Sequence, residues 1–136
     1  MDLYAENILA HAHHPQNTGP LRSATVTHEE LNASCGDALT IRIVIEKKRI
    51  KKFRWEGTGC VVSQAAMSML SERLQGMPVQ KAKKLQPKDI DHLLGVPIGI
   101  SRRKCALLCL HALKNALRKW EGLAAQGWRE TMDGKE

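Results

Sequence analysis

The sequence predicts an α+β fold in which a small antiparallel sheet of about three strands packs against several helices. Residues 38–46 and 50–56 alternate apolar and polar side chains on either side of a charged turn, the pattern of a hairpin with one buried face. Two longer segments, about 61–75 and 101–120, repeat apolar residues at helical spacing. With 43% hydrophobic residues, the 136 residues are expected to form one domain over 1–136.

The N-terminal part is expected to contain a helix, a loop and a strand. Residues 2–13 have a partly apolar helical face, and Pro15 ends the helix. The segment 14–20, HPQNTGP, has the composition of a loop. A first strand is expected over residues 25–31.

The central hairpin has the clearest strand pattern. Its first strand, 38–46, is joined by the charged turn 47–49 to its second strand, 50–56, which places Phe53 and Trp55 on the apolar face. Gly57-Thr58-Gly59 is expected to break this pattern before the helix of about 61–75 begins. The resulting sheet is antiparallel.

The second half of the chain is expected to be helical. Residues 79–94 form one or two short helices divided by Pro87, and 95–99 form a loop. Ser101 is suited to cap the last helix, which runs to about residue 120. The polar segment 122–136 is expected to be a flexible tail.

Composition and charge exclude some classes of protein and indicate others. No apolar run approaches the roughly 18 residues that span a bilayer, and acidic residues replace the start of a secretory signal, so a cytoplasmic protein without a membrane partner is expected. In a reducing compartment, four cysteines indicate metal ligands, catalytic thiols or core residues rather than disulfides. The net charge of +7 indicates an acidic partner, either a protein or a nucleic acid.

Three cysteines stand at comparable places in the predicted fold. Cys35 precedes the best strand, Cys60 begins a helix, and Cys105 lies in the first turns of the last helix. A helix N-terminus favours the thiolate, which is both a metal ligand and a nucleophile. Asp37 adds a carboxylate two residues after Cys35, and Gly36 permits close approach of the backbone.

Three thiolates and one carboxylate form a four-coordinate set suited to zinc, and thiolates also suit iron–sulfur clusters. The carboxylate of Asp37 is expected to be the most exchangeable ligand, since it is harder than sulfur. Spacing alone leaves the alternative that these are buried structural cysteines. Cys109, one helical turn after Cys105 among apolar neighbours, is interpreted as a core residue. The histidines are interpreted as structural or surface residues.

Four segments give the chain a recognisable family pattern. Residues 8–19 provide a short helix and a HPQNTG loop, and three motifs follow: LNASCGD at 31–37, GTGCVVSQAAMSML at 57–70 and RKCALL at 103–108. Over about residues 8–120 the sequence resembles the IscU / NifU N-terminal / SufU proteins of iron–sulfur cluster assembly, with SufU as the nearest branch. The resemblance implies a SufE/NifU-like fold.

The resemblance also implies a metal site made by Cys35, Asp37, Cys60 and Cys105, and a cysteine desulfurase as partner. Two departures qualify it. Lys104 stands where IscU-type scaffolds have a histidine, which favours a SufU-like role. The segment between the second and third cysteines is short, as in IscU, and lacks the usual SufU insertion.

The leading hypothesis is a zinc-containing sulfur acceptor, a sulfur-transfer protein rather than a stand-alone enzyme, in which Cys35 takes persulfide sulfur and Cys105 is the second candidate. An alternative is a scaffold that binds iron or a transient [2Fe–2S] cluster and passes it to a downstream scaffold or apo-acceptor. A zinc-stabilised nucleic-acid-binding module is the most distant alternative. It depends on the basic cluster of residues 47–54, which is interpreted mainly as a solvated or protein-docking face.

Overall fold

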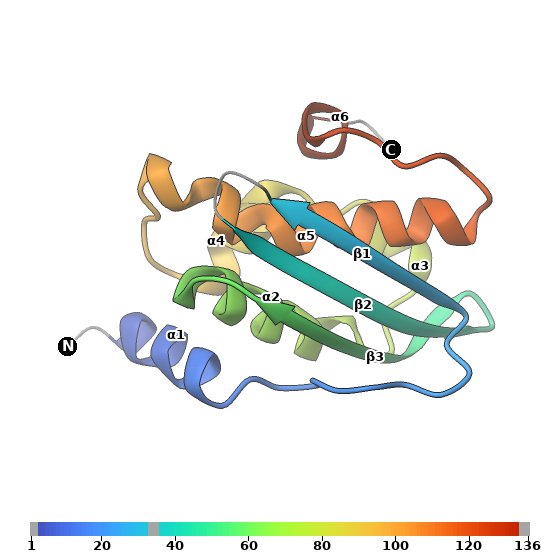
Figure 1. Cartoon of the computed structure of the whole chain (residues 1–136), viewed down its shortest axis with the longest axis horizontal. Helices are drawn as coiled ribbons and strands as arrows, with labels where there is room; N and C mark the ends of the chain where they lie inside the picture. The colour runs from blue at the N-terminus through green and yellow to red at the C-terminus, as the bar shows by residue number, and fades with distance from the viewer. Residues whose placement is uncertain (1–2, 33–35, 134–136) are drawn as a thin grey trace.

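The computed structural model describes residues 3–32 and 36–133 of the chain. In chain order the elements are α1 Leu3–His13, β1 Val26–Asn32, β2 Asp37–Glu46, β3 Arg49–Thr58, α2 Val61–Leu74, α3 Val79–Lys83, α4 Pro87–Leu94, α5 Ile100–Trp120 and α6 Trp128–Asp133. The α+β class predicted from the sequence is confirmed. Figure 1 shows the sheet lying across α2 and α5, with α6 on the β1 side and α1 on the β3 side.

The sheet has three antiparallel strands in the order β1-β2-β3, as predicted. The expected break at residues 57–59 comes two residues too early, because β3 continues through Thr58 and pairs that residue with Ala38. A Cβ atom at Gly57 would lie 2.5 Å from Leu39 Cδ2. Glycine therefore permits the close strand pairing here and does not end the strand.

The turn of the β2–β3 hairpin is sharp and basic. Lys47 and Lys48 both have positive φ, at 52° and 61°, which is the conformation of the tight turns that suit the twist of a hairpin. The turn lies at the opposite end of the sheet from the start of α2 (Figure 1). Ten strand residues separate the two ends, or about 30 Å at the usual strand rise.

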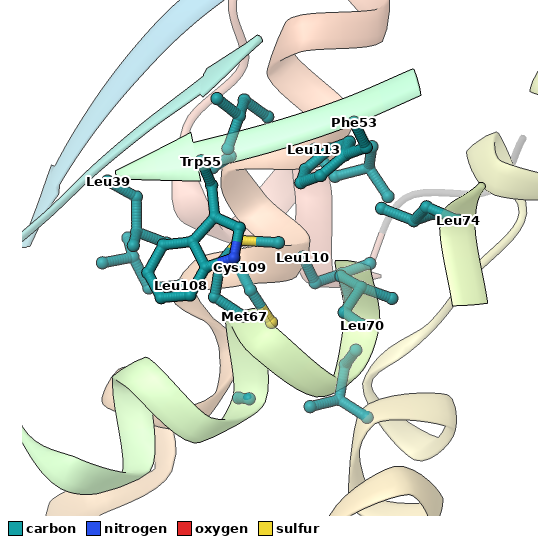
Figure 2. Packing of buried hydrophobic residues seen from close by; sticks show 14 of the residues in the cluster. Leu39, Phe53, Trp55, Met67, Leu70, Leu74, Leu108, Cys109, Leu110 and Leu113 are labelled. Atoms are coloured by element: carbon teal, nitrogen blue, oxygen red, sulfur yellow. The ribbon is translucent and has the colours of Figure 1, made fainter. Parts of the chain in front are cut away.

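The core fills the space between the sheet and helices α2 and α5. Phe53 and Trp55 are buried on the inner face, as predicted, and pack with side chains from both helices (Figure 2). The indole Nε1 of Trp55 donates a hydrogen bond of 2.8 Å to the carbonyl oxygen of Gln16, so its polar atom is satisfied. This apolar packing holds α2 and α5 against the strands that carry part of the candidate site.

The helix boundaries match the sequence patterns with one correction. The helical segment is divided into α3 and α4 as expected, and Pro87 is the first residue of α4. The prediction that Ser101 caps the last helix is wrong: α5 begins at Ile100 and its N-cap residue is Gly99, without a side-chain cap. Within the described residues, no helix is both long and apolar enough to cross a membrane.

The C-terminal segment contains a short helix that the sequence did not predict. Residues 128–133 form α6, and Thr131 within it is buried. The amide of Asn115 on α5 both accepts from the backbone N–H of Gln126, at 2.8 Å, and donates to its carbonyl oxygen, at 3.0 Å. Trp128 and Met132 pack against the core. Two apolar residues in a polar segment are a weak sequence signal, and it is their packing against the core that makes them partly buried.

Candidate metal centre

Three of the four predicted ligand residues meet at one end of the sheet. Asp37 is the first residue of β2, Cys60 is the N-cap residue of α2, and Cys105 lies near the start of α5. Their ligand atoms all lie within 4.8 Å of one another. The fourth residue, Cys35, lies outside the described residues. Because β2 begins where β3 ends, residues 23 positions apart in the sequence become neighbours here.

Asp37 has an environment that suits a cation. Its side chain is 2% exposed. One carboxylate oxygen, Oδ1, accepts a hydrogen bond of 3.1 Å from the backbone N–H of Cys60. The other, Oδ2, is buried and has no hydrogen-bond partner within the described part of the chain. A buried carboxylate oxygen without a hydrogen bond costs free energy of folding, and a positive charge bound beside it would offset that cost.

The backbone before Cys60 is shaped around this carboxylate. Gly59 has φ +155°, and a Cβ atom built there would lie 2.3 Å from Oδ1 of Asp37. A Cβ atom and a non-bonded oxygen do not approach this closely in proteins. The absence of a side chain at Gly59 is therefore what lets the Asp37 carboxylate reach the N–H of Cys60.

Cys60 serves as the helix cap with its sulfur atom. Its Sγ accepts a hydrogen bond of 3.4 Å from the backbone N–H of Ser63 and remains partly exposed. In the same first turn, Oγ of Ser63 and Nε2 of Gln64 are buried without a hydrogen-bond partner among the described residues. Sequence reasoning missed both residues, although they follow Cys60 directly in the quoted motif.

Cys109 is separate from this centre and belongs to the core, as predicted. It is 1% exposed, and its thiol donates a hydrogen bond of 3.4 Å to the carbonyl oxygen of Ala106. Burial raises the pKa of the Cys109 thiol to about 12, so this thiol stays protonated at neutral pH. Figure 2 shows its side chain within the apolar packing around Trp55.

Lys104, which replaces the scaffold histidine of the family pattern, is engaged on another side of α5. Its ammonium nitrogen lies 5.9 Å from the centroid of the Trp128 ring on α6, within the range of a cation–π contact. The centroid of the same ring lies 5.1 Å from that of the His111 ring, about two helical turns after Lys104 on α5. The helix α6 therefore gives the Lys104 charge a partner.

A second polar cluster, which sequence reasoning did not predict, surrounds Glu30 on β1. Its Oε1 accepts a hydrogen bond of 2.7 Å from the amide of Asn115 and lies 2.9 Å from Nε2 of His28. Its Oε2 lies 3.4 Å from Nε2 of His111, whose other ring nitrogen lies 2.7 Å from the hydroxyl of Thr131. The cluster ties β1, α5 and α6 together.

Comparison with known proteins identifies one family. The family model described as NifU-like N terminal domain matches residues 3–126. An iron–sulfur cluster assembly scaffold protein IscU from Thermotoga maritima is 33% identical, over 86% of this chain and 94% of that protein. The zinc-dependent sulfurtransferase SufU of Bacillus subtilis is 29% identical, over 88% of this chain and 92% of that protein.

A similarity among solved structures supports the same fold. The N-terminal part of a nitrogen-fixing NifU-like protein from Brucella abortus superposes with a TM-score of 0.74, covering 90% of this chain and 96% of that one, at 18% sequence identity.

Proposed function

The chain belongs to the NifU-like N-terminal domain family of iron–sulfur cluster assembly scaffolds, and from that premise we propose that it is a zinc-containing sulfur acceptor of the SufU type. It receives sulfur from the persulfide of a cysteine desulfurase. The observation that carries the proposal is the buried Oδ2 of Asp37, which has no hydrogen-bond partner among the described residues and stands beside two thiols.

The donor set fits zinc. Cys60 and Cys105 supply two thiols and Asp37 one carboxylate oxygen, and Cys35 is proposed as the third sulfur. Zinc bound there would hold the thiols as thiolates at neutral pH. The N–H of Cys60 keeps Oδ1 of Asp37 in place and leaves Oδ2 for the metal.

Sulfur transfer is a thiol exchange. The thiolate of Cys35 attacks the terminal sulfur of the donor persulfide, and a new S–S bond forms at Cys35 while the S–S bond in the donor breaks. The donor cysteine leaves as a thiolate, and the transferred sulfur keeps its oxidation state and its proton. No further oxidant or reductant is needed. Cys105 is the second candidate acceptor.

The experiment combines metal analysis with mass spectrometry after incubation with a cysteine desulfurase and cysteine. We expect about one zinc per chain, from the single four-ligand set, and one added sulfur atom that is lost in Cys35→Ala. Cys109→Ala is the matched control and is expected to retain both zinc and added sulfur. Added sulfur that persists in Cys35→Ala and disappears in Cys105→Ala would reassign the acceptor, and a chain without zinc or added sulfur would contradict the proposal.

Anaerobic reconstitution with iron and sulfide separates this function from cluster scaffolding. The Lys104 ammonium, which lies over Trp128, replaces a neutral histidine nitrogen that could bind iron. We therefore expect no stable [2Fe–2S] absorption spectrum. A stable cluster that transfers to an apo-acceptor would favour the scaffold function.

A further inference from the structure

A groove of about 360 Å³ lies among helices α2, α3 and α4, on a part of the molecule that the metal centre does not use. Four apolar side chains line it: Leu70, Met77, Leu85 and Leu93. Leu70 is fully buried and forms the floor, while the other three are partly exposed. The apolar surface that these three side chains still expose in the groove would be buried by a bound molecule.

The rim of the groove carries positive charge. Arg73 on α2 and Lys81 on α3 line it and are exposed, and neither has an ion pair with a carboxylate in the part of the chain that the structure describes. Asp89 is the acidic residue in the lining, and its Oδ2 already accepts a hydrogen bond of 2.7 Å from the backbone N–H of Gln86. His92 completes the polar lining.

The groove and the metal centre lie toward opposite ends of α2. Cys60 caps the start of that helix and Arg73 lies in its last turn, 13 residues later, so the two residues are about 20 Å apart at the usual helical rise. A molecule bound in the groove would leave the thiols open to a sulfur donor.

We propose that this groove binds an acidic amphipathic helix of a protein partner. Leucine-sized side chains on one face of that helix enter the groove between α2 and α4, and its carboxylates face Arg73 and Lys81. Charge complementarity selects this occupant, because apolar floor and basic rim occur together and the chain has a net charge of +7. The proposal is independent of zinc and of sulfur transfer.

The test uses a defined probe and a pair of charge-matched variants. The probe is a fluorescein-labelled synthetic helix with leucine at helical spacing on one face and glutamate elsewhere, and its binding to the full chain is followed by fluorescence anisotropy. In Arg73→Glu/Lys81→Glu we expect binding at least about tenfold weaker, from two lost charge contacts and two new repulsions. Lys84→Glu/Lys88→Glu makes the same change in net charge on residues that do not line the groove. This variant is expected to bind the probe with an affinity close to that of the unchanged protein.

A second arm tests the apolar floor without altering the protein. A probe whose leucines are replaced by serine keeps every carboxylate, and we expect its binding to be at least about tenfold weaker too. Equal loss of binding in the two charge-matched variants would overturn the proposal, since it would show general attraction to a basic protein. Equal binding of the serine probe would also overturn it. Unchanged zinc content and circular dichroism in both variants establish that the fold is intact.

Discussion

Two carboxylates lie two rungs apart on the inner face of the sheet, and they differ in how completely their oxygens are hydrogen-bonded. In the β1–β2 register, Asp37 pairs with Asn32 and Glu30 with Leu39. Both oxygens of Glu30 have partners, in Asn115, His28 and His111. Asp37 has a hydrogen-bond donor for one oxygen and none among the described residues for the other.

This difference distinguishes a structural carboxylate from a candidate ligand. A buried polar group whose hydrogen bonds are complete stabilises the fold as it stands. A buried oxygen with its bonding incomplete costs free energy until something binds it. The effect of an Asp37 substitution on stability should therefore depend on whether zinc is bound, and the effect of a Glu30 substitution should not.

The largest expected effect is the loss of a sulfur at the metal centre. Cys60→Ser should weaken zinc binding by more than about 100-fold, above the 10–100-fold typical of residues one step removed from a metal. Zinc is expected to raise the Tm of the unchanged protein, and this increase should disappear in the variant as well. Competition with a chromogenic zinc chelator measures the affinity.

The control for that change is Cys109→Ser, the same exchange of sulfur for oxygen in the core. It should lower the free energy of unfolding with or without zinc and leave zinc affinity unchanged. Equal loss of zinc affinity in both variants would contradict the division between centre and core.

The next effect is that substitution of Asp37 should change the stability in opposite directions with and without zinc. Asp37→Asn removes the charge and keeps an oxygen for the N–H of Cys60, so the zinc-free protein should gain about 1–2 kcal/mol of stability. The zinc-bound protein should lose stability, because the ligand is weaker. Urea unfolding with and without zinc measures both, and a loss in both conditions would contradict a metal role for Oδ2.

A smaller effect is expected at Glu30. Glu30→Gln weakens the contacts to His28 and His111 and should cost about 1–2 kcal/mol, since hydrogen bonds to charged groups are the stronger ones. The loss should be the same with and without zinc. A loss that appears only with zinc would mean that this cluster supports the metal centre.

The smallest effect concerns pH. Burial lowers the pKa of His111 from its ordinary value of 6.5, and the charge of Glu30 only partly opposes this. Between the lowered pKa and 6.5, the unfolded chain binds more protons at this residue than the folded chain does. Stability should therefore fall as pH falls through this window, and His111→Gln should reduce the slope. An unchanged slope of the unfolding free energy against pH would contradict this account.

Much of the fold and part of the site could be predicted because they depend on local patterns. The alternation in β2 and β3 and the helical spacing in α2 and α5 are visible in single segments. Cys60 and Cys105 were candidates by their places at the starts of helices and Asp37 by its place two residues after Cys35, and the family resemblance implied the same set. Their actual neighbourhood follows from the way the sheet lies across α2 and α5.

The rest depends on contacts between distant residues. His28 lies two residues before Glu30 on the same strand, whereas only the packing of α5 on β1 brings His111 to Glu30. One signal was available, because Glu30 falls at an inward position in the alternation of β1, where a charged residue needs partners. The contacts of Asn115 in α5 with Gln126, just before α6, were not predicted because they join residues on separate elements.

The close approach of the Gly59 backbone to the Asp37 carboxylate has a consequence for how such centres are recognised in sequences. Zinc accepts both cysteine sulfur and aspartate oxygen as ligands, so the ligand residues alone do not define such a centre. No residue with a side chain can replace Gly59 without displacing the carboxylate. In a survey of all substitutions, position 59 should tolerate as little change as the ligands themselves. An intolerant glycine before a cysteine would then mark a centre of this kind, even in chains whose ligands have diverged.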